Sequence, residues 1–163
     1  MGWYVLQVSP RSEKKVARVC DTYGLPYYLP LREDRRVYQR RKVVFHKPLF
    51  PGYLFVDLQP DTRVHVLRTN HVLRMFKPAD EEQLIHEIAQ IRLALLAEPQ
   101  LSAAPGLHEG ARVRIIAGVF AGVEGVVERC GHRSLVRLNV EMVGQSVPVE
   151  VDPDYLEILD TIT

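Results

Sequence analysis

A dense run of cations, interrupted by aromatic and β-branched residues, occupies residues 32–47 (REDRRVYQRRKVVFHK). Seven lysines and arginines stand in this run against two acids, Glu33 and Asp34. Four more cations are expected on one side of the helical segment 12–24: Lys14, Lys15 and Arg18 within it, and Arg11 directly before it. Clustered cations of this kind bind polyanions through phosphate contacts, whereas any one of them taken singly is more often a solvated surface charge.

The charge of the chain is divided unevenly between its two halves. Residues 1–77 carry a net charge of +9 and residues 78–163 a net charge of −8, although the whole chain is only +1. A basic half beside an acidic half predicts a polyanionic partner for the first and a different partner for the second.

A second candidate binding segment is PLFPGYLFV, residues 48–56, in which two prolines and a glycine stand among large apolar and aromatic side chains. Pro51 does not suit the middle of a strand, and Gly52 permits a tight or left-handed turn. Alternation after Gly52 predicts that Leu54 and Val56, or Phe55, are core residues. From residue type alone, the commoner role of Phe50 and Tyr53 would also be in the core.

Catalytic and metal-binding patterns are absent from the sequence. There is no P-loop, GxGxxG or GxSxG, and the six histidines lack HxxxH spacing. The two cysteines, Cys20 and Cys130, form no CxxC and are expected to be reduced thiols. The chain is therefore expected to be a binding protein rather than an enzyme, with no cofactor and no metal.

The elements that would position these segments fall into two groups. Up to residue 99 we expect four strands, three helices and a basic segment that forms a β-hairpin or an ordered loop. The strands are 3–8, 27–31, 52–58 and 71–76, the helices are 12–24, 60–69 and 78–99, and the basic segment is 32–47. Ser12 and Asp80 are predicted helix caps. The Pro- and Gly-rich segment 98–108 is expected to be a linker. Short β-type runs between frequent turns then predict a small all-β barrel or sandwich.

Hydrophobic residues make up 47% of the chain, which is enough for a core. No apolar run is long enough to span a membrane, and the N-terminus lacks a charged-then-apolar signal pattern. These features predict a cytoplasmic protein.

Three strings carry a family resemblance: WYVLQV (3–8), PLFPGYLFV (48–56) and GARVRIIAGVFAGVEGVV (110–127). In order and spacing they resemble the bacterial NusG/RfaH family of transcription elongation factors. The resemblance implies an α+β fold, with an NGN domain over residues 1–97, a linker over 98–108 and a KOW domain, an SH3-like all-β barrel, over 109–160. It also implies a monomeric factor whose NGN domain binds the clamp helices of RNA polymerase and suppresses pausing. The KOW domain would recruit Rho or the small-subunit ribosomal protein NusE.

The resemblance assigns roles to particular residues. The polymerase-binding set is Phe50, Pro51, Gly52 and Tyr53, with Trp3, Tyr4 and Phe76 as neighbours. Phe50 and Tyr53 are expected to be partly exposed or covered by the second domain, and their joint truncation to leave the fold intact. The set facing upstream or non-template DNA is Arg11, Lys14, Lys15, Arg18, Arg35, Arg36, Arg40, Arg41 and Lys42. Tyr38 would stack on an exposed base.

In the barrel, the resemblance places partner binding at Phe120, Met142, Val143 and Gly144, while Met142 could instead point into the barrel. Val119 stands where the family usually has proline, which favours an RfaH-like member over the housekeeping one. Valine-rich runs favour a stable barrel over the helical hairpin that RfaH-type members can form. The alternative function is an RNA-binding or ribosome-associated KOW module, which the acidic second half disfavours.

Overall fold

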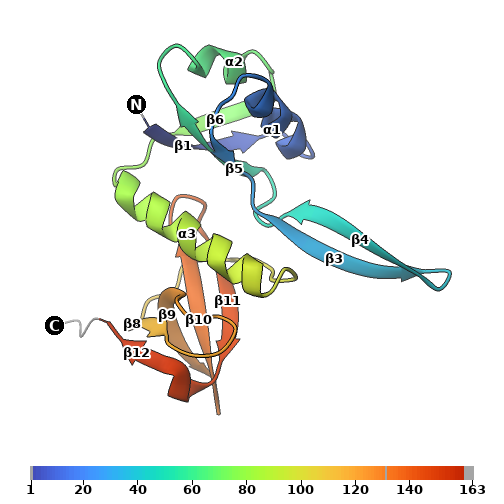
Figure 1. Cartoon of the computed structure of the whole chain (residues 1–163). Helices are drawn as coiled ribbons and strands as arrows, with labels where there is room; N and C mark the ends of the chain where they lie inside the picture. The colour runs from blue at the N-terminus through green and yellow to red at the C-terminus, as the bar shows by residue number, and fades with distance from the viewer. Residues whose placement is uncertain (1, 131, 160–163) are drawn as a thin grey trace.

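The computed structural model describes residues 2–130 and 132–159, apart from the side chains of Arg129 and Cys130. Residues 1 and 160, the outer limits of the two expected domains, lie outside this range. Two sheets are separated by the helix α3 (Glu81–Ala97), and a long two-stranded ribbon projects to one side (Figure 1). The mixed α+β fold class predicted from the sequence is confirmed.

The first sheet has four antiparallel strands. In spatial order they are β2 (Tyr27–Tyr28), β5 (Tyr53–Leu58), β1 (Gly2–Val8) and β6 (Val72–Phe76). Helices α1 (Glu13–Thr22) and α2 (Arg63–Leu67) lie on one side of this sheet and α3 on the other (Figure 1). Because successive side chains of a strand point to opposite faces of the sheet, alternate residues face α1 and α2, and the residues between them face α3.

Each face of the first sheet belongs to a different core. Leu6, Leu54 and Val56 pack with Val16 and Cys20 of α1 in one buried cluster. The alternate strand residues, among them Val5 and Phe55, belong to a second cluster that contains buried residues of α3 and of the barrel: Leu84, Ile88, Ile91, Ala94, Val113, Ile115, Val136 and Leu138. The two halves of the chain therefore share one continuous hydrophobic core.

The second sheet contains six antiparallel strands and forms the barrel. Its spatial order is β12 (Leu156–Ile158), β8 (Arg112–Ile115), β9 (Glu124–Cys130), β10 (Arg133–Val140), β11 (Gln145–Val151) and β7 (Ala104–Pro105). A 3-10 turn, Pro153–Tyr155, precedes β12. The strict alternation of buried residues along β10 fills the barrel interior with valine and leucine.

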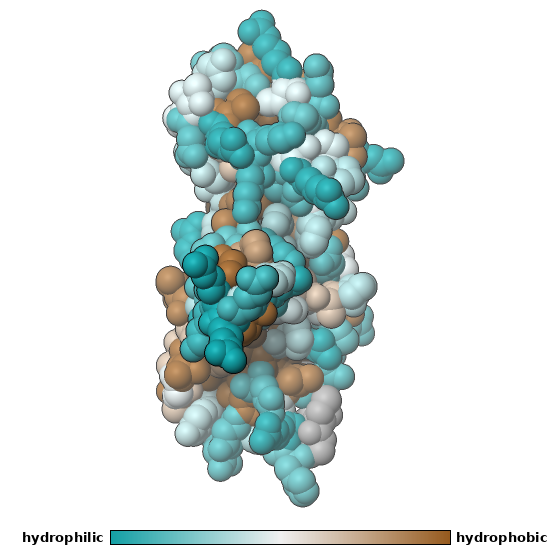
Figure 2. All heavy atoms as spheres, turned by 90° about the vertical axis from the view of Figure 1, so that its right-hand side faces the viewer, coloured by the Kyte–Doolittle hydropathy of each residue, from teal (hydrophilic) through white to brown (hydrophobic). Residues whose placement is uncertain are grey.

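The ribbon consists of β3 (Leu31–Tyr38) and β4 (Arg41–Pro48), paired only with each other. Gln39 and Arg40 form its two-residue turn with φ angles of 46° and 68°, which is the backbone of a type I′ hairpin turn. In Figure 2 the ribbon points toward the viewer, and its hydrophilic tip stands in front of the body.

Three local expectations are corrected. The strand expected over 27–31 is divided, because β2 ends at Tyr28 and Leu31 already begins the ribbon. Ser12 does not cap α1 with its side chain, since its hydroxyl bonds to Ser9 and to Nδ1 of His71. The expected linker contributes β7, which pairs with β11 in the barrel sheet. Asp80 does cap α3, accepting from the Gln83 N–H at 3.1 Å.

Candidate docking surface and nucleic-acid interface

The backbone turns sharply at Pro51 and Gly52, immediately before β5. Gly52 has a φ of 87°, in the region that favours glycine. The Val8 N–H donates to the Gly52 carbonyl at 2.8 Å, and the Gly52 N–H donates to Oε2 of Glu13 at 2.8 Å. Glu13 is a buried residue in the first helical turn of α1. Its carboxylate lies outside the PLFPGYLFV segment and holds the Pro51–Gly52 turn in place. Sequence reasoning missed this role because nothing in the local pattern links Glu13 to Gly52.

Aromatic residues gather on the face of the first sheet that looks toward α3. Phe50 is buried in the shared cluster, and Trp3, Tyr53 and Phe76 are partly buried against it. Tyr4 is the exception among the expected docking residues. It packs in the other cluster, which contains residues of α1, because neighbouring strand residues point to opposite faces. The structure therefore separates Tyr4 from this aromatic face.

This aromatic face is covered rather than open. Phe50 is 1% exposed and lies in the same cluster as residues of α3 and of the barrel, while Tyr53 is half-buried. Pro51 is exposed beside them. Because Phe50 is fully enclosed, the structure corrects the expectation that its truncation would leave the fold intact.

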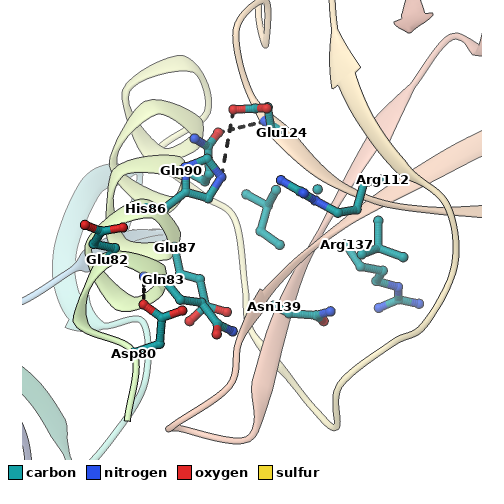
Figure 3. A pocket seen from close by; sticks show the side chains of 13 residues that line it. Asp80, Glu82, Gln83, His86, Glu87, Gln90, Arg112, Glu124, Arg137 and Asn139 are labelled. Atoms are coloured by element: carbon teal, nitrogen blue, oxygen red, sulfur yellow. Dashed lines mark hydrogen bonds and ion pairs between the residues drawn. The ribbon is translucent and has the colours of Figure 1, made fainter. Parts of the chain in front are cut away.

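Polar contacts join α3 to the barrel at the start of β9 and at the turn after β10 (Figure 3). The Glu124 N–H donates to Oε1 of Gln90 at 2.7 Å, and Gln90 is itself buried. The Glu141 N–H, in the turn between β10 and β11, reaches the carboxylate of Glu87 at 3.3 Å. Between these contacts lies a cavity of about 540 Å³, with carboxylates on its helix side and Arg112 and Arg137 on its barrel side.

The structure brings some of the expected nucleic-acid cations together at the base of the ribbon. A groove of about 620 Å³ is lined by Arg11 and Lys14 of the α1 region and by Lys47 of β4. Lys14 also donates from Nζ to the His46 carbonyl at 2.6 Å, which ties α1 to the ribbon. Lys15 and Arg18 are exposed but do not line this groove.

The remaining cations lie along the ribbon and differ in their partners. Arg35 pairs with Glu33 at 2.7 Å, and Arg36 pairs with Asp34 at 2.9 Å. Within the described part of the chain, the three cations nearest the turn have no acidic partner: Arg40, Arg41 and Lys42. The tip of the ribbon is therefore an uncompensated positive surface.

The sequence of the chain matches a known protein family. Residues 1–92, more than half of the chain, match the family described as "Transcription termination factor nusG". The chain belongs to this family. It is 31% identical over 128 residues to the transcription termination/antitermination protein NusG of Thermus thermophilus, covering 69% of this chain and 68% of the relative.

Relatives named NusG also match over nearly the full length. The Escherichia coli K12 protein is 27% identical, with 95% of this chain and 94% of the relative covered. The solved structure titled "Domain interaction in Thermotoga maritima NusG" aligns with a TM-score of 0.52 and 22% identity, covering 98% of this chain and 97% of that one. This likeness supports the shared fold.

In this NusG-family chain, the expected partner-binding residues of the barrel lie near α3. Val143 is buried, Phe120 is partly buried against the shared cluster, and Gly144 has a φ of 70° in the turn after β10. Met142 packs against the shared cluster and lines a small cavity with Leu84 at the start of α3. The β10–β11 turn thus faces the helix in this arrangement.

Neither a membrane span nor a metal cluster is found in residues 2–130 and 132–159. No helix there is long and apolar enough to cross a bilayer. No three His, Cys, Asp or Glu side chains of that range gather where they could hold an ion.

Glu87 is the most perturbed carboxyl group at the contact between α3 and the barrel. Burial raises its pKa from 4.5 to about 7, and the neighbouring Glu141 charge adds to the rise. Hydrogen bonds from the Glu141 N–H and from Gln83 oppose the rise but do not cancel it. The folded protein therefore favours the neutral carboxyl group.

The Glu87→Gln variant is expected to be more stable than the natural chain at pH 8 and equal to it at pH 5. A raised folded pKa contributes stability that is fully present below about 4.5 and is lost as the pH rises through about 7. A shift of this size corresponds to ~3 kcal/mol, and we expect about 1 kcal/mol because the carboxyl group keeps some contact with solvent. Denaturant unfolding across this pH range measures the effect.

The matched control is Glu82→Gln, which changes an exposed carboxylate on the same helix. It should leave the difference in unfolding free energy between pH 5 and pH 8 unchanged. The role of Glu87 is contradicted if both variants show the same pH profile as the natural chain.

Proposed function

We propose that this protein is a transcription elongation and antitermination factor that binds RNA polymerase and is not an enzyme. The observation that carries the proposal is the single aromatic face formed by Trp3, Phe50, Tyr53 and Phe76, in a chain of the NusG family. Rings collected on one sheet face form a surface on which a pair of apolar helices can pack. Large aromatic residues are the side chains most often dominant in such interfaces.

The two halves of the chain take different parts in this proposal. Residues 1–97 act as the NGN domain, which docks on the clamp helices of polymerase, and residues 109–160 act as the KOW domain. Because α3 lies over the aromatic face and the barrel packs on α3 (Figure 1), docking requires α3 to shift and its contact with the barrel to loosen. Loosening would also free the β10–β11 turn, with Met142 and Val143, to meet Rho or the ribosomal protein NusE.

In the same proposal, the cations of the ribbon and of α1 contact DNA. With polymerase held by the aromatic face, the uncompensated tip formed by Arg40, Arg41 and Lys42 would lie beside upstream or non-template DNA. Contacts of this type neutralise phosphates and weaken steeply with salt.

The proposal is tested with the purified full-length chain and RNA polymerase core from the same organism. We expect the two to comigrate in size-exclusion chromatography and the chain to shorten pauses in single-round transcription. Comigration with ribosomal subunits or binding to RNA, with no binding to polymerase, would favour the ribosome-associated alternative and reject the proposal.

A further inference from the structure

The contact between α3 and the barrel has two polar ends. At the turn between β10 and β11, the Glu141 N–H donates to the carboxylate of Glu87 at 3.3 Å. At the start of β9, the Glu124 N–H donates to Oε1 of Gln90 at 2.7 Å. Each end also holds a titratable side chain of α3, Glu87 at the first and His86 at the second (Figure 3). The protonation of these two side chains therefore bears on whether the barrel stays on α3.

The first end sets two carboxyl groups from different elements close together. Gln83 donates from Nε2 to Oε2 of Glu141 at 2.5 Å, and the same side chain bonds to Glu87. Two carboxylates held by one amide repel each other when both are ionised. Glu87 is also partly enclosed, so its charged form loses solvation. Burial first and the Glu141 charge second raise the pKa of Glu87 to about 7.

The second end depends on pH through a histidine. Nε2 of His86 lies 3.8 Å from Oε2 of Glu124. The two side chains attract each other as ions only when the imidazole ring is protonated, and a rising pH removes that proton. Both ends therefore respond with the same sign: acid strengthens the contact between α3 and the barrel, and base weakens it.

The other charged groups around Glu87 do not reverse this sign. Arg112 and Arg137 line the barrel side of the cavity, and arginine keeps its charge throughout the neutral range. On the side of α3, Asp80 is engaged as the helix cap and Glu82 is exposed. The titratable and charged side chains that line the two cavities beside Glu87 are Asp80, Glu82, His86, Arg112, Glu124, Arg137 and Glu141.

We propose that this contact is a proton-dependent latch, in which the Glu87 carboxyl group holds a proton while the barrel lies on α3 and gives it up to water when the barrel leaves. Departure of the barrel removes Glu141 and exposes Glu87, so the carboxyl group ionises as an ordinary glutamate does. Because opening releases a proton, a rise in pH shifts the equilibrium toward the open arrangement. The consequence for polymerase rests on the proposed function, in which docking requires this contact to loosen.

The size of the effect follows from the titration of Glu87. Its contribution to the closed arrangement is fully present below about 4.5 and is lost as the pH rises through about 7. A carboxyl group that used this whole range would raise the ratio of open to closed molecules about tenfold between pH 6 and pH 8. We expect about fivefold, because Glu87 keeps some contact with solvent in the closed arrangement.

The test measures NMR relaxation of the backbone amides of the full-length chain at pH 6 and at pH 8. A closed chain tumbles as one body, whereas an open barrel reorients independently of the first sheet. We expect the rotational correlation times of the two parts to agree at pH 6 and to diverge at pH 8. Glu87→Gln, whose side chain is neutral at every pH, is expected to lose most of this divergence.

Two variants show which groups make the latch. The matched control Glu82→Gln changes an exposed carboxylate of the same helix and should respond to pH as the natural chain does. Adding His86→Gln to Glu87→Gln should remove the response that remains. The latch is overturned if the natural chain behaves alike at both pH values, or if Glu87→Gln diverges as fully as Glu82→Gln.

Polymerase binding gives an independent measurement of the same equilibrium. The apparent affinity of a mostly closed chain scales with its open fraction. Relative to Glu87→Gln, the natural chain should therefore bind polymerase core about fivefold more tightly at pH 8 than at pH 6. Any pH dependence of polymerase itself is common to both chains and cancels in this ratio. A constant ratio with retained binding would reject the latch alone, whereas no binding by the natural chain at either pH would reject the proposed function.

Discussion

Replacing Phe50 by alanine is expected to lower the free energy of unfolding by about 3–5 kcal/mol. The ring is 1% exposed and lies in the cluster that joins the first sheet, α3 and the barrel, so its loss leaves a cavity that its neighbours cannot fill. Denaturant unfolding, monitored through tryptophan fluorescence, measures this change in the free energy of unfolding. Trp3, the only tryptophan of the chain, packs against the same cluster and reports its disruption.

The matched control is Phe45→Ala, which removes the same side chain from the exposed ribbon. Its effect on unfolding should stay within about 0.5 kcal/mol, the usual range for surface substitutions. If the Phe50 and Phe45 variants were equally stable, Phe50 could not be part of the shared core in solution.

Replacing Tyr53 by alanine is expected to weaken polymerase binding by about 2 kcal/mol, or roughly thirtyfold, because a central aromatic anchor would be lost. Tyr53 is the better probe of docking than Phe50, since it is only half-buried and its loss disturbs the core less. The measurement is the dissociation constant for polymerase core, determined by interferometry with the full-length chain immobilised.

Tyr23→Ala is the corresponding control. Tyr23 is 51% exposed at the end of α1, where it stacks on His65 at 3.9 Å, on the side of the sheet away from α3. Its removal should leave polymerase binding unchanged. A Tyr53 variant that binds as tightly as the Tyr23 variant would exclude the aromatic face as the docking surface.

Local patterns in the sequence were sufficient for most of the elements. Alternation after Gly52 predicted Leu54 and Val56, or Phe55, as core residues, and all three are buried. The capping signal at Asp80 predicted the start of α3. The cations and aromatics of residues 32–47 predicted a basic β-hairpin or an ordered loop, and the structure has the hairpin of β3 and β4. These features depend on residues close together in the chain, whose conformational preferences act over one turn or one strand pair.

Other features depended on long-range packing and could not be read from the chain. Tyr4 and Trp3 are neighbours in the sequence, which did not indicate which face of the sheet each side chain occupies. Nothing in the sequence indicated the hydrogen bond between Glu13 and Gly52. It left open whether Phe50 would be partly exposed or covered by the second domain, and the fold encloses it in the cluster that contains residues of α3 and of the barrel.

The sequence by itself determined the α+β architecture, the NusG-family membership and the basic ribbon. Only the tertiary structure decided that the barrel packs on α3, that the aromatic face beneath is covered, and that Glu87 is held near neutrality at the contact. The physical reason is that hydrophobic periodicity specifies which residues must be buried. It does not specify against which other element they are buried, because that choice depends on the complementary shape and charge of surfaces far apart in the chain.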